Sequence, residues 1–113
     1  MKTTRHCFAL DLKNNPELIA EYKEYHSAGN VWPEVIKSIK DSGIVDLQIY
    51  LVENRMFMIM EVDETFDAEK KATMDANNPK VQEWEDLMWT FQQALPWAKK
   101  GEKWIPMEKV FQL

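Results

Sequence analysis

Three stretches of the chain are rich in apolar residues in the manner of β-strands, and along the first of them hydrophobic and polar residues alternate loosely. These stretches are residues 5–12 (RHCFALDL), 44–52 (IVDLQIYLV) and 55–62 (RMFMIMEV). The dipeptide Glu53-Asn54 between the last two predicts a hairpin turn. Both faces of the 55–62 stretch are mostly apolar, which predicts a central strand that is covered on both sides.

Helical patterns fill the intervals between these strands. Asn15 and Asn78 each precede a proline, so each is placed to cap a helix that begins at that proline. In the last helical stretch, apolar residues recur at three- and four-residue steps until Pro96, as in an amphipathic helix. These residues are Val81, Trp84, Met88, Phe91 and Leu95, and the four expected helices span residues 16–26, 33–42, 69–76 and 79–95.

A last strand is predicted for residues 104–113 (WIPMEKVFQL), with Pro106 restricting its first half to a sheet edge. The expected order is then strand, helix pair, strand, strand, helix pair, strand. This is an α+β fold of the ferredoxin-like βαββαβ kind, with helices on one face of the sheet. A second copy stacked on the other, apolar face would bury it, so we expect a homodimer. Residues 1–113 suit one domain.

Composition narrows the classes of partner. The chain is 45% hydrophobic and 29% charged, as ordinary globular proteins are, and its net charge of −5 disfavours nucleic acid as a partner. Its apolar runs fall short of the roughly 20 residues that span a membrane, and the N-terminal run is too short for a signal peptide. Cys7 is the single cysteine, so no internal disulfide is possible and a cytoplasmic location is expected.

The candidate chemistry is proton transfer. The sequence contains no glycine-rich phosphate loop, Gly-x-Ser-x-Gly or Cys-x-x-Cys motif, and two histidines with one cysteine predict no metal site and no cofactor. Tyr22 and His26 are four residues apart, so on a helix they share one face. Histidine titrates near neutral pH, and the phenol offers a hydrogen-bond partner and a flat wall. The alternative is a surface histidine at a helix end beside a core tyrosine.

Six segments, in a fixed order, carry a resemblance that covers essentially the whole chain. They are EYKEYH, VWPEV, QIYL, FMIMEV, VQEWEDLM and MEKVFQL. With these segments the chain resembles the L-rhamnose mutarotase family, and family members assigned to L-fucose share the same features. The resemblance implies a dimeric α/β barrel of ferredoxin-like subunits. It also implies interconversion of the α and β anomers of a free 6-deoxy-hexose, a small sugar substrate, without a cofactor.

The resemblance also implies roles for individual residues. His26 matches the active-site histidine of the family, Tyr22 the substrate-binding tyrosine beside it, and Trp84 the first of two adjacent sugar-contacting tryptophans. The second of those tryptophans is replaced by Glu85, and a further substrate-contacting tyrosine is replaced by Leu47. These departures concern the shape of the pocket, so the choice between L-rhamnose and L-fucose stays open.

The mechanism expected from these residues is acid–base ring opening. His26 gives a proton to the ring oxygen as the anomeric hydroxyl loses one, the open aldehyde rotates about one bond, and the ring recloses as the other anomer. Tyr22 holds the sugar and Trp84 packs on its apolar face. Two alternatives remain: a haem- or quinone-handling monooxygenase of the same dimeric architecture, and a non-catalytic dimeric ligand-binding module.

Overall fold

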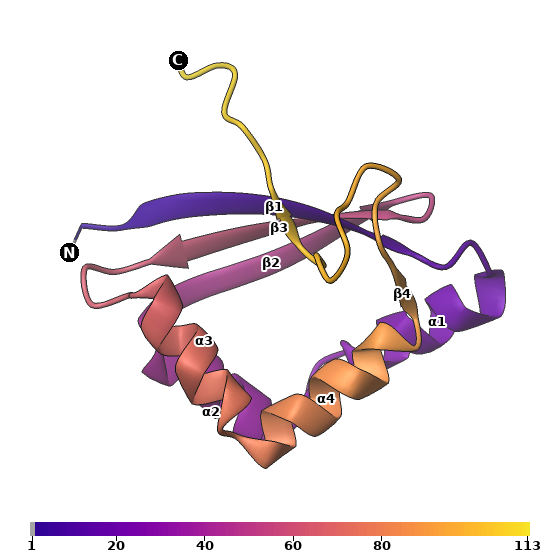
Figure 1. Ribbon diagram of the computed structural model, residues 1–113, viewed down its shortest axis with the longest axis horizontal. Helices are drawn as coiled ribbons and strands as arrows, with labels where there is room; N and C mark the ends of the chain where they lie inside the picture. Colours follow the sequence, from indigo (N-terminus) through magenta and orange to yellow (C-terminus); the bar gives the residue numbers. More distant parts are fainter. Residues whose placement is uncertain (1) are drawn as a thin grey trace.

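Residues 2–113, which the computed structural model describes, form an antiparallel sheet with four helices on one of its faces (Figure 1). The strands are ordered β2-β3-β1-β4, and β5 also pairs with β1. This order and the helix placement confirm the α+β class and the ferredoxin-like arrangement. The elements are β1 Thr4–Leu12, α1 Pro16–Tyr25, α2 Pro33–Asp41, β2 Ile44–Val52, β3 Arg55–Val62, α3 Ala68–Ala76, α4 Pro79–Trp89, β4 Gln92–Gln93 and β5 Ile105–Pro106.

The hairpin of β2 and β3 forms where the sequence predicts it. Glu53 adopts a left-handed backbone conformation (φ 54°) in the turn, so the tight connection forms without the usual glycine. Asp11 is buried on β1, and its carboxylate accepts two hydrogen bonds from the Arg55 guanidinium, at 2.8 and 3.2 Å. A bidentate pair of this kind fixes the relative position of the two strands that it joins, β1 and β3.

The predicted starts of α1 and α4 are confirmed. Asn15 Oδ1 accepts hydrogen bonds from two backbone N–H groups in the first turn of α1, at 2.9 and 3.1 Å. Asn78 Oδ1 does the same for α4, at 3.1 and 3.3 Å. Pro16 and Pro79, which lack an N–H group, occupy the first helical positions, where no partner for that group would exist.

The predicted end of the last helix is wrong, because α4 ends at Trp89 and not at Leu95. Thr90 follows the helix, and its hydroxyl donates to the Leu87 carbonyl at 2.6 Å. The chain then turns into β4, so Phe91 packs in the core and Gln92 pairs with β1. Every residue of the predicted apolar stripe is buried, but the stripe continues beyond the helix: Val81, Trp84, Met88, Phe91 and Leu95.

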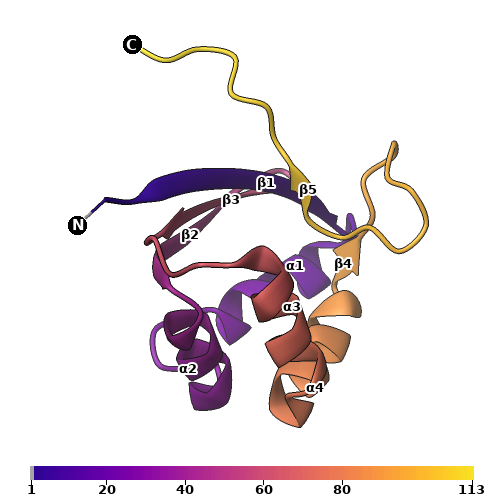
Figure 2. The ribbon, with the colours of Figure 1, turned by 60° about the vertical axis from the view of Figure 1, so that its left-hand side comes forward.

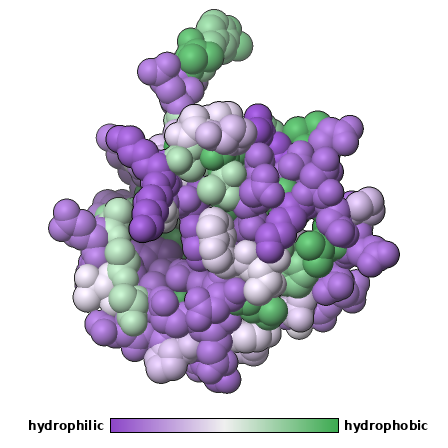
Figure 3. All heavy atoms as spheres, turned by 45° about the vertical axis from the view of Figure 1, so that its right-hand side comes forward, coloured by the Kyte–Doolittle hydropathy of each residue, from purple (hydrophilic) through white to green (hydrophobic). Residues whose placement is uncertain are grey.

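The predicted strand over residues 104–113 is also wrong, because only Ile105–Pro106 pairs with β1. The Met107 N–H group still donates to the Cys7 carbonyl at 2.8 Å, after which the chain separates from the sheet. Residues 107–113 are exposed and leave the body on the side of the sheet opposite the helices (Figure 1 and Figure 2). Figure 3 shows the projecting segment with apolar residues near its tip.

The two faces of the sheet differ in how they are covered. Leu10, Leu12 and Met56 point toward the helices and are almost fully buried in the main core. On the opposite face, Tyr50 is 49% and Val52 is 57% exposed. Within residues 2–113, therefore, β3 is central as predicted, but apolar cover on its outer face is incomplete.

Candidate functional site

A cavity of about 650 Å³ lies between the helices and the inner face of the sheet. This volume falls in the range typical of small-molecule sites, about 300–1,000 Å³. Much of the lining is apolar, including Leu47, Met58, Met60, Val81 and Met88. Polar side chains gather in two places, which we name the imidazole cluster (Tyr22, His26 and Gln92) and the ion-pair cluster (Ser38, Lys71 and Asp75).

In the imidazole cluster, His26 follows the last residue of α1 and lines the cavity. Its Nδ1 atom lies 2.7 Å from the backbone carbonyl oxygen of Tyr22. A carbonyl can only accept, so Nδ1 carries the hydrogen and donates it. In the neutral ring this leaves Nε2 with its lone pair, ready to accept a proton.

Tyr22 supports the imidazole a second time, through its ring. The two ring centroids are 4.3 Å apart with planes 29° from parallel. The phenol oxygen accepts a hydrogen bond from Gln92 Nε2 at 3.2 Å, and both side chains are buried. Burial raises the pKa of Tyr22 above its ordinary value of 10.0, although the Gln92 hydrogen bond lowers it by a smaller amount. The phenol therefore keeps its own hydrogen, which the bond from Gln92 leaves free to donate.

Trp84 forms an aromatic wall beside this cluster. Its ring meets His26 edge-on with centroids 5.6 Å apart, and it meets Trp32 at 5.2 Å and Tyr25 at 6.2 Å. Trp84 is 7% exposed and also lines the cavity. Trp84 therefore has two roles: it packs in the core, and it forms part of the cavity wall. Trp32, just before the first residue of α2, packs against Trp84.

The pKa of His26 is lowered from its ordinary value of 6.5, mainly by burial, while the hydrogen bond to the Tyr22 carbonyl raises it by less. As the pH falls through about 6.5, the unfolded chain takes a proton on His26 before the folded chain does. The neutral, partly buried imidazole therefore favours the folded state above about pH 6.5. This stabilisation is lost as the pH falls toward the lower pKa of His26 in the folded state.

We expect the thermal unfolding midpoint of the native protein to fall between about pH 6.5 and pH 5 more steeply than that of a His26→Gln variant. Glutamine keeps a polar side chain but does not titrate, so the difference between the two curves isolates the imidazole. If the unfolding midpoints of the two proteins changed equally with pH, the lowered pKa of His26 would be contradicted. The imidazole titration followed by NMR should have its midpoint below 6.5.

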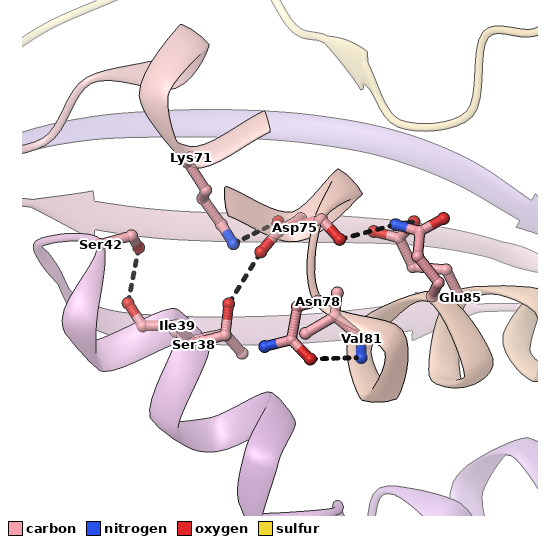
Figure 4. Close-up of polar contacts among 9 residues, drawn as sticks. Ser38, Ile39, Ser42, Lys71, Asp75, Asn78, Val81 and Glu85 are labelled. Atoms are coloured by element: carbon pink, nitrogen blue, oxygen red, sulfur yellow. Dashed lines mark hydrogen bonds and ion pairs between the residues drawn. The ribbon is translucent and has the colours of Figure 1, made fainter. Parts of the chain in front are cut away.

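The ion-pair cluster joins three helices (Figure 4). Lys71 Nζ of α3 donates to Asp75 Oδ2 at 2.7 Å, and the Ser38 hydroxyl of α2 donates to Asp75 Oδ1 at 2.8 Å. The Gln82 amide of α4 donates to the backbone carbonyl of Asp75 at 2.9 Å and to Glu85 Oε2 at 3.4 Å. Both Lys71 and Asp75 line the cavity.

The structure brings together the three residues that the sequence singles out, Tyr22, His26 and Trp84, in one wall of the cavity. Leu47 and Glu85, the two departures from the family pattern, line it as well.

Gln92 and the ion-pair cluster are not among the site residues that the sequence predicts. Gln92 lies within the predicted helix 79–95, and the chain turn that buries it has no local signal. Lys71 and Asp75 have the spacing of an ordinary surface pair.

Two classes of feature are absent from the described part of the chain. Residues 2–113 contain no group of three or more His, Cys, Asp or Glu side chains placed to hold a metal ion. None of the helices within this range has the length and apolar character needed to cross a membrane.

Comparisons with known proteins identify the family to which the chain is similar. The family model described as L-rhamnose mutarotase matches residues 5–113. The chain is 43% identical over 113 residues to the L-fucose mutarotase of Xanthomonas campestris pv. campestris, covering 100% of this chain and 90% of that protein. It is 31% identical over 109 residues to the L-rhamnose mutarotase of Phocaeicola vulgatus, covering 96% and 97%.

A solved structure agrees with these sequence relatives. The crystal structure of an L-rhamnose mutarotase from Formosa agariphila superimposes with a TM-score of 0.70 at 28% identity, covering 97% of this chain and 98% of that one. Family model, relatives and fold all agree with the resemblance drawn from the sequence. The chain therefore belongs to the L-rhamnose mutarotase family, whose members are isomerases that interconvert the anomers of a free sugar.

Proposed function

We propose that this protein interconverts the α and β anomers of a free 6-deoxy-hexose of the L-rhamnose or L-fucose type, with the sugar bound in the 650 Å³ cavity. One observation carries the proposal. The Nδ1–H group of His26 is held by the Tyr22 carbonyl, which leaves Nε2 as a proton acceptor on a side chain that lines the cavity. The Tyr22 and Trp84 rings lie beside the imidazole, and both residues line the cavity.

The first step is ring opening. His26 Nε2 takes the proton from the anomeric hydroxyl, the electrons of that O–H bond form the C1=O double bond, and the bond from C1 to the ring oxygen breaks. The Tyr22 hydroxyl supplies the proton that the ring oxygen takes. This assignment reverses the role expected for His26 from the sequence, because a neutral imidazole with Nδ1–H already donating has an acceptor to offer and no second donor.

Ring closure returns both protons. After rotation about the C1–C2 bond, the hydroxyl formed from the ring oxygen attacks the other face of C1 and gives its proton back to Tyr22. The imidazolium returns its proton to the carbonyl oxygen, which becomes the anomeric hydroxyl again. Gln92 holds the phenol in place throughout, and Trp84 offers an apolar face to the carbon side of the sugar. Protons and electrons balance over the cycle, and no other reactant is required.

Polarimetry tests the proposal. Crystalline L-fucose or L-rhamnose dissolves as one anomer, and its optical rotation drifts to equilibrium slowly in buffer alone. The protein should shorten this drift in proportion to its concentration for at least one of the two sugars. An unchanged drift for both sugars would overturn the proposed function.

We propose further that the protein acts as a homodimer. The outer face of the sheet exposes Tyr50 and Val52 beside half-buried Phe57. The projecting C-terminal segment is apolar at Phe111, which is 76% exposed, and at Leu113, which is fully exposed. A second copy stacked on this side would cover both surfaces at once.

The single cysteine favours a reducing compartment such as the cytoplasm.

Sedimentation should find a particle of twice the 13.4 kDa chain mass. Val52→Glu and Phe111→Glu place a charge on the two proposed contact surfaces, and each should shift the equilibrium toward the monomer. Met74→Glu is the matched control, because Met74 is 36% exposed on α3, on the helix side of the sheet. A monomeric native protein, or equal behaviour of all three variants, would contradict the dimer.

A further inference from the structure

We propose that the Lys71–Asp75 ion pair is a specificity-determining subsite, which binds two neighbouring hydroxyls of the sugar away from its anomeric carbon and so selects L-fucose over L-rhamnose. The inference rests on the proposed function, because it places the sugar in the same cavity. It gives a role to the polar end of that cavity, which ring opening itself does not use (Figure 4).

The environment of this ion pair differs from that of a similar pair elsewhere in the chain. Lys37 and Asp41 of α2 have the same i,i+4 spacing and a 2.6 Å contact, but their side chains are 69% and 49% exposed. The side chains of Lys71 and Asp75 are 21% and 16% exposed and line the cavity. Holding two charges away from water costs free energy unless further polar partners complete their hydrogen bonds. A bound polyol is such a partner.

The ion pair has hydrogen-bonding capacity to spare. An ammonium group has three donors, and Lys71 uses one of them on Asp75. A carboxylate has about four acceptor positions, and Asp75 uses two, for Lys71 and for the Ser38 hydroxyl. The spare donors and acceptors stand side by side. Each of two adjacent sugar hydroxyls can therefore accept from Lys71 and donate to Asp75, which an apolar ligand or an aromatic ring cannot do.

The position of the subsite indicates which hydroxyls it meets. Trp84 contacts His26, and Val81, three residues earlier on α4 and about 4.5 Å along the helix axis, also lines the cavity. Gln82 beside it holds the backbone carbonyl of Asp75. With the anomeric carbon at His26, we assign the ion pair to hydroxyls farther along the ring, at C3 and C4.

The two candidate sugars differ at these carbons. L-Fucose has the galacto configuration, with its hydroxyls at C3 and C4 on the same side of the ring. L-Rhamnose has the manno configuration, with the same-side pair at C2 and C3, next to the anomeric centre. At C4 the hydroxyl is axial in L-fucose and equatorial in L-rhamnose, so the two sugars present the C3 and C4 hydroxyls in different directions. We assign the ion pair to the arrangement in L-fucose.

A purely structural role is the competing explanation. No residue of α3 is buried, so Asp75 with its bonds to α2 and α4 is a main attachment of this helix. Loss of Asp75 then lowers stability, and lowers activity toward every sugar alike. The experiment must separate this outcome from a change in sugar preference.

The test measures anomer exchange and equilibrium sugar binding by NMR for the native protein, Lys71→Met and Asp75→Asn, each with L-fucose and with L-rhamnose. Lys37→Met in the exposed pair is the matched control. We expect the first two variants to raise KM and Kd for L-fucose by about 10- to 100-fold, the range for hydrogen bonds to charged groups. Their kcat for L-fucose should change little, their KM for L-rhamnose should rise by a smaller factor than their KM for L-fucose, and the control should match the native protein.

Three results would overturn the subsite. One is an unchanged KM for L-fucose in both variants. Another is an equal loss toward both sugars with a lowered unfolding midpoint, especially if Ser38→Ala, which removes the bond to α2 but leaves the ion pair, reproduces it. The third is a native preference for L-rhamnose. A native protein that accelerates neither sugar would instead refute the proposed function, and this inference with it.

Discussion

Replacing His26 with alanine should slow the protein-accelerated anomer exchange by about 10²–10⁴-fold, the contribution typical of one positioned acid–base group. The variant loses the only group in the mechanism that takes the anomeric proton. Polarimetry or NMR exchange measurements on native and variant protein at equal concentration check the result.

The variant must stay folded for this comparison to be valid. His26 is only partly buried and follows the end of α1, so its loss should leave the far-ultraviolet circular dichroism unchanged. His26→Asn is the second variant. Its short amide lacks a basic nitrogen, so activity should stay low. A His26→Ala protein that keeps half of the native rate would show that the proton is taken elsewhere.

Trp84→Ala should have the largest effect on stability. Truncation of a buried tryptophan typically costs about 3–5 kcal/mol, through lost apolar contact and the cavity that is left. Trp84 is 7% exposed and contacts the rings of Tyr25, His26 and Trp32, so the loss should reach the upper part of this range. Urea unfolding of native and variant protein measures it. Activity should fall with stability, because the imidazole loses the wall against which it rests.

Trp89 provides the control within the same helix. It is 38% exposed and carries the Lys103 ammonium over its ring at 5.0 Å. Trp89→Ala should therefore cost no more than about 1 kcal/mol. If Trp84→Ala does not fold, Trp84→Phe keeps a smaller ring and should be intermediate. Equal costs for the two alanine variants would contradict the central place of Trp84 in the core.

The local signals in the sequence predicted the fold well where one residue acts on its immediate neighbours. Asn15 and Asn78 cap helices as predicted, since a cap needs only the next few N–H groups. The hairpin at Glu53 also forms as predicted. The errors lie where two structures satisfy the same pattern. Burial of Phe91 and Leu95 is achieved equally by a longer helix and by a turn into the sheet.

The last strand shows a different limit of sequence reasoning. Residues 104–113 have a strand-like composition, but only Ile105–Pro106 finds a pairing partner within residues 2–113. Whether an apolar segment pairs depends on a free edge, which is a property of the assembled sheet and not of the segment. We interpret the exposed Val110 and Phe111 as contacts for the second subunit of the proposed dimer.

The candidate site was predictable only where its contacts are local in the sequence. Tyr22 and His26 are one helical turn apart, so their contact follows from spacing alone. Gln92 meets Tyr22 across 70 positions of sequence, and Ser38 meets Asp75 across 37, so neither contact has a local signal. The protonated nitrogen of His26 was also not predictable, because it depends on which carbonyl the folded chain places within 2.7 Å of Nδ1.

The central claim is that a neutral imidazole in the cavity takes the anomeric proton. Its most direct test is the exchange rate between the two anomeric proton signals of L-fucose, measured by saturation transfer with and without the protein from about pH 5 to pH 8. We predict an acceleration that is constant at neutral pH and declines only below 6.5, as the lowered pKa of His26 requires. An exchange rate equal to that of buffer at every pH would contradict it.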